Sequence, residues 1–415
     1  MAKAGHNTLA AIDIGTAKIC AMVALTRDGG LPPEVIGIGH AASEGLRGSS
    51  IVDMDAAESA IARAMQEAED SAGCRVNSVL INISAGNIAS ERIDVSRSIT
   101  GDEVTGADVA ATLAGAEPKT PGERLLLHKL PLDYTLNDNL SVKEPRGMMA
   151  RKLAATVHVA TVERTVAASL LRAVRRCHLE VSSLVASPYA SALSCLVDDE
   201  MQLGTTLVDM GAGSTTLAVF QGGHLLHLAS IPLGGHHITK DIAYGLSTTL
   251  ADAERFKVLH GSALANTLDD RDILDIPIVG EMDKTHTSHV PRSYLTRIIQ
   301  PRVEETLEKL RATLDDAGLD KSAGRLVVLT GGASQLPGVR DAAAQILDKK
   351  TRLGKPQGFH GLPAEYQGAA FSTVTGLLRY ARLPNHDVVR LPIATRSGEG
   401  KLSISKAIGW LRENF

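Results

Sequence analysis

Two similar stretches decide the fold of this chain: Ala-Ile-Asp-Ile-Gly-Thr-Ala-Lys at residues 11–18 and Leu-Val-Asp-Met-Gly-Ala-Gly-Ser-Thr at residues 207–215. Each is an apolar strand that ends in an aspartate, Asp13 or Asp209, and continues through a glycine turn into a second apolar strand. Glycine lets the backbone turn sharply and lets an anion approach bare N–H groups. Two such hairpins facing each other would hold a polyphosphate from both sides, with the aspartates placed to bind Mg²⁺.

One copy alone would be weak evidence, because an apolar run that ends in Asp-x-Gly is a common strand and turn. Neither copy is a Walker A loop, since G-x-x-x-x-G-K-[ST] does not occur in the sequence. Gly211 and Gly213 also do not make a dinucleotide fingerprint. The third glycine is missing, and a strand-like run follows where a helix should begin.

A third element supports the nucleotide interpretation. Residues 326–335, Leu-Val-Val-Leu-Thr-Gly-Gly-Ala-Ser-Gln, indicate a buried strand, a turn at Gly331 and Gly332, and a helix beginning at Ser334. Paired glycines permit close contact with a base or sugar, and a helix N-terminus favours a nearby phosphate. Taken alone, this piece could be an ordinary strand-to-helix turn. Following two phosphate hairpins, it predicts a nucleotide site.

These motifs resemble the actin, Hsp70 and sugar-kinase ATPase superfamily and, within it, the FtsA family of bacterial cell division proteins over essentially the whole chain. The runs that carry the resemblance are residues 13–18, 241–245, 252–261, 329–334 and the last dozen residues. The resemblance implies an α/β, actin-like two-lobed ATPase fold made of duplicated ribonuclease H-like cores. It also implies an inserted α+β subdomain on the first lobe and a C-terminal amphipathic helix.

ATP with Mg²⁺ is the ligand that the resemblance implies. Glu254 and Lys257 share a helix face at i, i+3 spacing and would address the ribose and base, although a surface ion pair is the alternative for this pair alone. Asp13 and Asp209 would orient the metal, through water. The full set of expected nucleotide contacts is Asp13, Gly15, Thr16, Lys18, Asp209, Gly211, Gly213, Ser214, Gly234, Gly235, Glu254, Lys257, Gly331, Gly332 and Ala333.

Two departures from the superfamily pattern concern hydrolysis. Thr216 stands where many members carry a second aspartate, and residues 186–191, Ala-Ser-Pro-Tyr-Ala-Ser, offer no glutamine or carboxylate to activate water. Loss of such groups typically costs orders of magnitude in rate. We therefore expect tight nucleotide binding with at most weak ATPase activity, no assigned catalytic residue, and a nucleotide that controls lobe closure and polymerisation.

Hydrophobic periodicity and turn residues divide the chain into segments. Residues 55–72 show the spacing of a helix with one buried face, and Thr105 and Asp108 form the pattern of a capping box. We assign residues 1–83, 162–200 and 364–382 to the first nucleotide lobe (1A), 84–161 to the inserted subdomain (1C), 201–235 and 320–363 to the second lobe (2A), 236–319 to an outer subdomain (2B), 383–402 to a flexible linker and 403–415 to a membrane-targeting helix.

Composition excludes several classes of protein. Hydrophobic residues make up 44% of the chain, enough for a full core, while a net charge of −4 and 3% aromatic residues argue against nucleic-acid binding. Four scattered cysteines without a C-x-x-C pair fit free thiols in a reducing cytosol. The pair His236–His237, read as part of a strand, would point to opposite faces, so we expect no metal there. No apolar run approaches the ~20 residues that span a bilayer.

The last residues have different chemistry. At ~100° per residue, an apolar stripe forms beside Trp410, with charged residues on the opposite face; the expected membrane contacts are Ile404, Ala407, Ile408, Trp410, Leu411 and Phe415. This pattern favours a helix lying in the interface of an anionic membrane, although a terminal helix docked on the core is the alternative. The resemblance places the protein at the cytoplasmic face of the inner membrane, at the division septum.

The resemblance also implies partners. The outer subdomain would bind the C-terminal tail of FtsZ, with Arg292, Arg297 and Arg302 steering an acidic peptide unless they form only a solvated face. The inserted subdomain would serve self-association into filaments and contact with later divisome membrane proteins. Two rival functions share the fold: a sugar or small-molecule kinase, with Asp13 as a general base, and a chaperone ATPase, which would need an appended peptide-binding domain.

Overall fold

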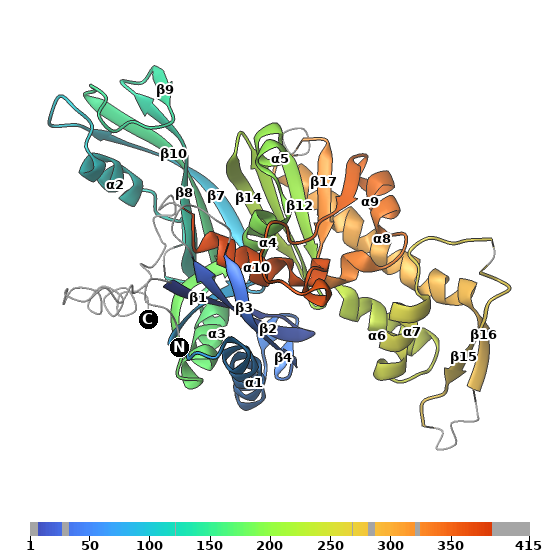
Figure 1. Cartoon of the computed structure of the whole chain (residues 1–415). Helices are drawn as coiled ribbons and strands as arrows, with labels where there is room; N and C mark the ends of the chain where they lie inside the picture. Colours follow the sequence, from blue (N-terminus) through green and yellow to red (C-terminus); the bar gives the residue numbers. More distant parts are fainter. Residues whose placement is uncertain are drawn as a thin grey trace.

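The computed structural model describes residues 7–26, 33–120, 122–267, 269–280, 287–319 and 324–383. Two lobes, each built on a five-stranded sheet, lie side by side, and a separate four-stranded module extends from the first lobe (Figure 1). The predicted linker and membrane helix lie outside the described residues. Among the described helices, none is both long enough and apolar enough to cross a membrane.

The two five-stranded sheets have the same topology. In each, an antiparallel three-stranded meander is followed by two strands added in parallel, giving the orders β3-β2-β1-β6-β11 and β14-β13-β12-β17-β18. This repetition confirms the predicted duplicated core. The strands of the first sheet are β1 (Asn7–Ile14), β2 (Lys18–Thr26), β3 (Glu34–Ala42), β6 (Ser78–Ile83) and β11 (Glu180–Ala186). Those of the second are β12 (Thr205–Met210), β13 (Thr215–Gln221), β14 (His224–Ile231), β17 (Leu326–Thr330) and β18 (Lys350–Leu353).

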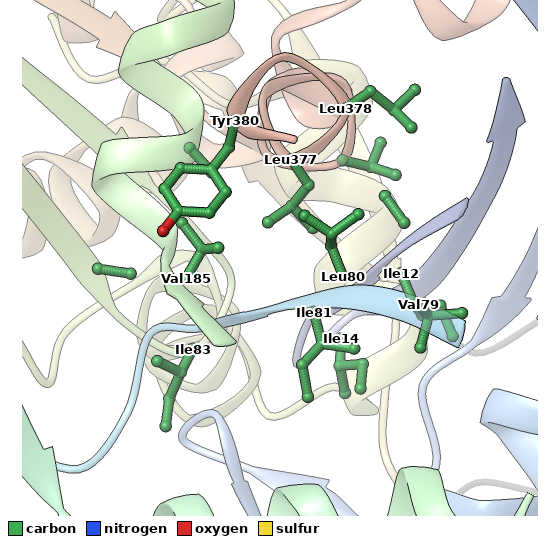
Figure 2. Packing of buried hydrophobic residues seen from close by; sticks show 14 of the residues in the cluster. Ile12, Ile14, Val79, Leu80, Ile81, Ile83, Val185, Leu377, Leu378 and Tyr380 are labelled. Atoms are coloured by element: carbon green, nitrogen blue, oxygen red, sulfur yellow. The ribbon is translucent and has the colours of Figure 1, made fainter. Parts of the chain in front are cut away.

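Helices cover both faces of the first sheet, which is why its strands are apolar along nearly their whole length. Figure 2 shows Leu377 of α10 (Ser372–Tyr380) meeting Leu80 of β6, while Ile81 and Ile83 lie on the other side of the strand. The remaining helices of this lobe are α1 (Met54–Ala72), α3 (Arg164–Arg176) and α4 (Ser187–Cys195). The predicted helix at 55–72 is confirmed, with Asp53 capping its N-terminus and Gly73 its C-terminus.

The second lobe has its own hydrophobic core, which runs from one face of its sheet to its outer helices. Besides the sheet, its elements are α5 (Asp198–Leu203), α6 (Gly235–Gly245), α7 (Leu250–His260), β15 (Ile273–Pro277), β16 (Thr287–Pro291), α8 (Arg292–Asp316) and α9 (Val339–Leu347). One face of α8 packs Leu295, Ile299 and Val303 into this core. The four cysteines are free thiols, as predicted.

The module has its own small core and sheet. It consists of β7 (Ala89–Ser98), α2 (Gly106–Ala114), β8 (Arg124–Leu136), β9 (Leu140–Val142) and β10 (Lys152–Glu163). The predicted capping box of Thr105 and Asp108 begins α2. Strand β8 continues through Pro131, and its register with β10 shifts between Pro131 and Asp133, so a residue without an N–H is accommodated inside a ladder.

Two predicted helix starts are wrong. Instead of a helix from Ser334, a 3₁₀ turn (Gly332–Gln335) ends before Pro337, because the residue before proline is pushed to extended backbone, and α9 begins after Gly338. Likewise, the sequence of residues 365–380 reads as one continuous helix, but the helix starts only at Ser372. Short 3₁₀ turns at Ala364–Tyr366 and Ala369–Phe371 precede it, separated by extended backbone at Gly368.

The module also touches the second lobe, where the edge strands β7 and β14 meet. The Ser90 hydroxyl donates to the carbonyl of Leu228 (3.0 Å) and accepts from its N–H (2.7 Å), and the N–H of Ile88 donates to Ser230 (3.2 Å). A side chain thereby replaces a backbone partner at a sheet edge. Nearby on β14, burial together with Arg92 of β7 lowers the pKa of His227.

This contact should weaken in acid. A histidine whose pKa is lower in the folded than in the unfolded protein is protonated more readily in the unfolded state. Protonation therefore favours unfolding, and stability is lost as pH falls below the unfolded pKa of about 6.5. We expect the melting temperature of His227→Gln to fall less between pH 7.5 and 5.5 than that of the unmodified chain. His178→Asn, at an exposed site with positive φ, is the control. Equal slopes for all three proteins would contradict the assignment.

Candidate functional site

The glycine turns of the two repeated hairpins face one cavity of about 490 Å³ between the lobes. This volume lies within the usual range of ligand pockets. Every residue predicted to contact nucleotide lines this cavity except Gly234. They are Asp13, Gly15, Thr16 and Lys18 from the first hairpin, Asp209, Gly211, Gly213 and Ser214 from the second, and Gly235, Glu254, Lys257, Gly331, Gly332 and Ala333.

The two turns have the same geometry. The N–H of Gly15 donates to the carbonyl of Lys18 (3.1 Å), and the N–H of Gly211 donates to that of Ser214 (2.9 Å). A Cβ added to either glycine would lie 2.9 Å from the carbonyl oxygen that accepts this glycine's own N–H. Real Cβ atoms do not approach that closely, so glycine is required at both places for the turn to close.

The hairpin tips also touch each other. A Cβ on Gly213 would lie 2.4 Å from the Thr16 hydroxyl, which explains the second glycine of this turn. Helix α6 supports the second tip, since the N–H groups of Gly235 and His236 donate to the carbonyls of Gly211 (3.0 Å) and Ala212 (2.8 Å). Gly234 serves this support: a Cβ there would lie within 2.7 Å of both carbonyl oxygens. Its place is behind the hairpin rather than in the cavity.

Both aspartates are buried, and each is held by neutral donors. Asp13 accepts from the Asn82 amide (2.7 Å), and Asp209 accepts from the hydroxyls of Ser191 (2.6 Å) and Thr373 (3.1 Å). Burial raises the pKa of Asp13 to about 7, with Lys18 opposing the shift and Asp209 adding to it. Burial likewise raises the pKa of Asp209. Two carboxylates that are costly to ionise fit a divalent cation, which would favour their charged forms.

Other ligating groups do not gather here: among the described residues no cluster of three or more His, Cys, Asp or Glu side chains could hold a metal. Two carboxylates without further side-chain ligands suit Mg²⁺, which keeps several of its own waters. His236 and His237 begin helix α6, so the strand assumed for them is wrong. The apolar residues Ile238, Ile242 and Leu246 follow helical spacing and would have indicated this from sequence.

Lys18 lies in the cavity wall, with its ammonium engaged by another segment. Its Nζ donates to the carbonyl of Ala370 (2.7 Å) and lies 3.1 Å from the centre of the Phe371 ring. Burial lowers the pKa of this lysine, an effect that Asp13 opposes. A phosphate contact, as predicted for Lys18, would therefore need the ammonium to divide its hydrogen bonds between the anion and Ala370.

The opposite end of the cavity carries the predicted nucleoside contacts. Lys257 donates to Glu254 (2.7 Å), to Thr239 (2.9 Å) and to the carbonyl of Gly235 (3.1 Å). Although burial would raise it, these bonds from Lys257 and Thr239 lower the pKa of Glu254 overall. Gly331 has φ +84°, and a Cβ there would lie 2.3 Å from Asp209 Oδ1. Only glycine brings this turn so close to the second aspartate.

Several residues that form the site were not predicted. Asn82, Ser187 and Thr373 hold the aspartates or line the cavity, and Ser49 reaches it from a small hairpin. Asn82 could have been found, because it interrupts the apolar run at residues 78–83. Ser187 and Thr373 carry no comparable signal, since they reach the site only through the packing of α4 against α10.

Comparisons with known proteins agree on one family. The family model described as "Cell division protein FtsA" matches residues 206–376, and that of the "SHS2 domain inserted in FTSA" matches residues 85–161. Cell division protein FtsA of Agrobacterium fabrum (strain C58) is 41% identical over 421 residues, covering 99% of this chain and 95% of that protein.

Solved structures extend the likeness to the fold. The PilM–PilN type IV pilus biogenesis complex matches with a TM-score of 0.63 at 19% identity, covering 91% of this chain and 99% of the other. MreB5 of Spiroplasma citri bound to ADP matches with a TM-score of 0.51 at 13% identity, covering 89% and 94%. At such identities the likeness concerns the architecture alone.

Proposed function

The chain belongs to the FtsA family of cell division proteins, and we propose that it binds ATP with Mg²⁺ between its lobes and tethers FtsZ filaments to the membrane. In this proposal it polymerises on the cytoplasmic face of the inner membrane at the septum. The inserted module serves self-association and contact with later divisome membrane proteins. Family membership leaves no reason to retain the sugar kinase or the chaperone as a function.

One observation carries the nucleotide part of the proposal: two equivalent glycine turns and two buried aspartates converge on one cavity. Backbone N–H groups of the turns around Gly15 and Gly211 would donate hydrogen bonds to phosphate oxygens, one turn from each lobe. Asp13 and Asp209 would hold Mg²⁺ through its waters, and Glu254 and Lys257 would bind the ribose and base. The metal would supply charge neutralisation of the phosphates when bound.

Hydrolysis should be weak. Thr216 lines the cavity where a carboxylate is common in the superfamily, and the first turn of α4 presents Ser187. A hydroxyl cannot accept a proton from water as a carboxylate does. We therefore assign the nucleotide a role in setting lobe closure and filament assembly, with binding rather than turnover as the controlling event.

Membrane attachment is assigned to residues 403–415, which lie outside the described residues. The proposed contacts with anionic lipid are those predicted from the amphipathic pattern of this segment. A single short helix binds weakly, and polymerisation would raise the avidity by ~10²–10⁴. This coupling would make attachment depend on filament formation.

The three arginines proposed to steer the FtsZ tail differ in their contacts with the rest of the protein. Arg302 is paired with Asp241 (2.6 Å) and with Glu305, and Arg292 lies 3.7 Å from Asp269 and donates to the carbonyl of His260. Arg297 is exposed on the same helix. We therefore assign the steering role to Arg297 and a packing role to the other two.

Arg297→Glu should weaken binding of the acidic FtsZ C-terminal tail peptide by about fivefold, because reversing an exposed charge changes an ion pair by roughly 1 kcal/mol. Fluorescence anisotropy with a labelled tail peptide measures this. Arg311→Glu, the same charge reversal further along α8, should bind as the unmodified chain does. If Arg297→Glu also binds normally, the tail site lies on another surface.

The whole proposal is tested by co-sedimentation with vesicles that contain phosphatidylglycerol. FtsZ should enter the pellet only when this protein and Mg·ATP are both present, because attachment needs filaments and filaments need nucleotide. FtsZ that remains in the supernatant under all conditions would refute the tethering function.

A further inference from the structure

A small hairpin of the first lobe ends in the cavity. Strands β4 (Leu46–Arg47) and β5 (Ser50–Ile51) are joined by Gly48 and Ser49, both at positive φ, +56° and +64°. Two positive φ values are the requirement of the tight hairpin turn that matches strand twist, and glycine or asparagine is the usual choice there. Serine is disfavoured in this conformation, and its presence therefore indicates that the side chain has a role here.

Hydrogen bonds at the hairpin base fix where its tip lies. The N–H groups of Val52 and Asp53 both donate to the carbonyl of Gly45 (2.8 and 3.1 Å), and Asp53 caps α1 directly afterwards. A Cβ on Gly45 would lie 2.3 Å from the carbonyl of Asp53. The tip is therefore held in place by hydrogen bonds of the first lobe at the N-terminus of α1.

Ser49 is bonded to both phosphate hairpins. Its N–H donates to the Thr16 hydroxyl (2.9 Å), and its own hydroxyl lies 3.1 Å from Thr16 Oγ1 and 3.2 Å from Ser214 Oγ. Thr16 belongs to the first lobe and Ser214 to the second. The Ser49 hydroxyl thus bridges the two lobes at the point where the hairpin tips meet.

This bridge leaves one O–H group free to bind a ligand. Three hydroxyl groups, of Thr16, Ser49 and Ser214, supply three O–H donors, and the two hydroxyl–hydroxyl contacts use two of them. One O–H is left to donate, and all three side chains line the cavity. An anion gripped by both hairpin tips would meet this donor.

Resting on the nucleotide site assigned above, we propose that Ser49 is a third phosphate-binding group, specific for the terminal phosphate of a nucleoside triphosphate. The terminal phosphate is the one that both tips enclose, whereas the nucleoside lies toward Glu254 and Lys257. In the triphosphate state the Ser49 hydroxyl donates to the phosphate and keeps the lobes joined. With a diphosphate it returns to Ser214. Ser49 therefore discriminates triphosphate from diphosphate.

The test is calorimetric titration of the full chain with Mg·AMPPNP and with Mg·ADP. Ser49→Ala removes the hydroxyl and keeps the unfavourable φ, while Ser49→Gly removes the hydroxyl and relieves it. Both should lose AMPPNP affinity by about 10- to 100-fold, the value of a hydrogen bond to a charged group, with ADP affinity within about twofold of normal. Ser50→Ala, one residue along the same hairpin, should change neither.

Each other outcome overturns the proposal. An unchanged AMPPNP-to-ADP ratio in both Ser49 variants removes the phosphate contact. Weakened binding in Ser49→Ala alone assigns the effect to backbone strain, which the melting temperatures of the two variants would also reveal. An equal loss in Ser50→Ala assigns it to the hairpin fold. If the unmodified chain binds neither nucleotide, the nucleotide site itself is wrong, and this inference fails with it.

Discussion

Asp209→Asn should lose at least about 100-fold in affinity for Mg·ATP and almost none for ATP measured in EDTA. The carboxylate is buried, and its charge is the part of the site that a divalent cation recognises. Asparagine keeps an oxygen to accept the hydroxyls of Ser191 and Thr373, so the packing between the lobes should survive. Calorimetry with and without Mg²⁺ separates loss of the metal from loss of the nucleotide.

Asp209→Ala should show the same loss of affinity together with a lower melting temperature, because two buried hydroxyls would lose their acceptor. Asp341→Asn removes an exposed carboxylate that pairs with Arg340 and should leave both affinities unchanged. Normal Mg·ATP affinity in either Asp209 variant would end the assignment of the second hairpin as a metal-binding phosphate loop.

Trp410→Glu/Leu411→Glu should release the protein from anionic vesicles and leave ATP binding intact. The sequence pattern predicts that both side chains lie on or beside the apolar stripe of residues 403–415, and burying a charge at the membrane interface cancels the gain from apolar contact. Because a filament multiplies every contact, the difference in flotation should be largest with Mg·ATP.

A matched control separates apolar contact from charge. Ser405→Glu/Gly409→Glu adds the same two negative charges away from the stripe, so it should retain a larger share of vesicle binding than the first variant. If Trp410→Glu/Leu411→Glu floats with vesicles as well as the unmodified chain does, the membrane anchor lies in another segment.

Local patterns predicted much of the fold, because the repeated hairpins and α1 are defined by residues close together in sequence. Asp13 and Gly15 could be placed from one strand and one turn. The starts of α9 and α10 could not be placed by periodicity, since Pro337 and Gly368 interrupt runs that otherwise look helical. Such interruptions are decided by backbone conformation and not by the apolar pattern.

The site was predictable only where its residues lie on the repeated motifs. Thr373 reaches Asp209 because α10, which follows the whole second lobe in the sequence, packs back on the first lobe. Ser49 reaches Ser214 across 165 positions of sequence. Contacts of this kind follow from sheet order and helix packing, which a single sequence does not encode in its spacing.

The hydrogen bonds between Ser90 and Leu228 couple the position of the inserted module to that of the second lobe. Strand β8 runs outward for 13 residues, about 40 Å at the usual rise of a strand, so a rotation of about 5° at its root would displace its far end by about 3–4 Å. Because these hydrogen bonds tie the root of the module to the second lobe, a movement of one lobe against the other would have to break them or tilt the module. Such a tilt would move the far end of the module more than any part near the lobes.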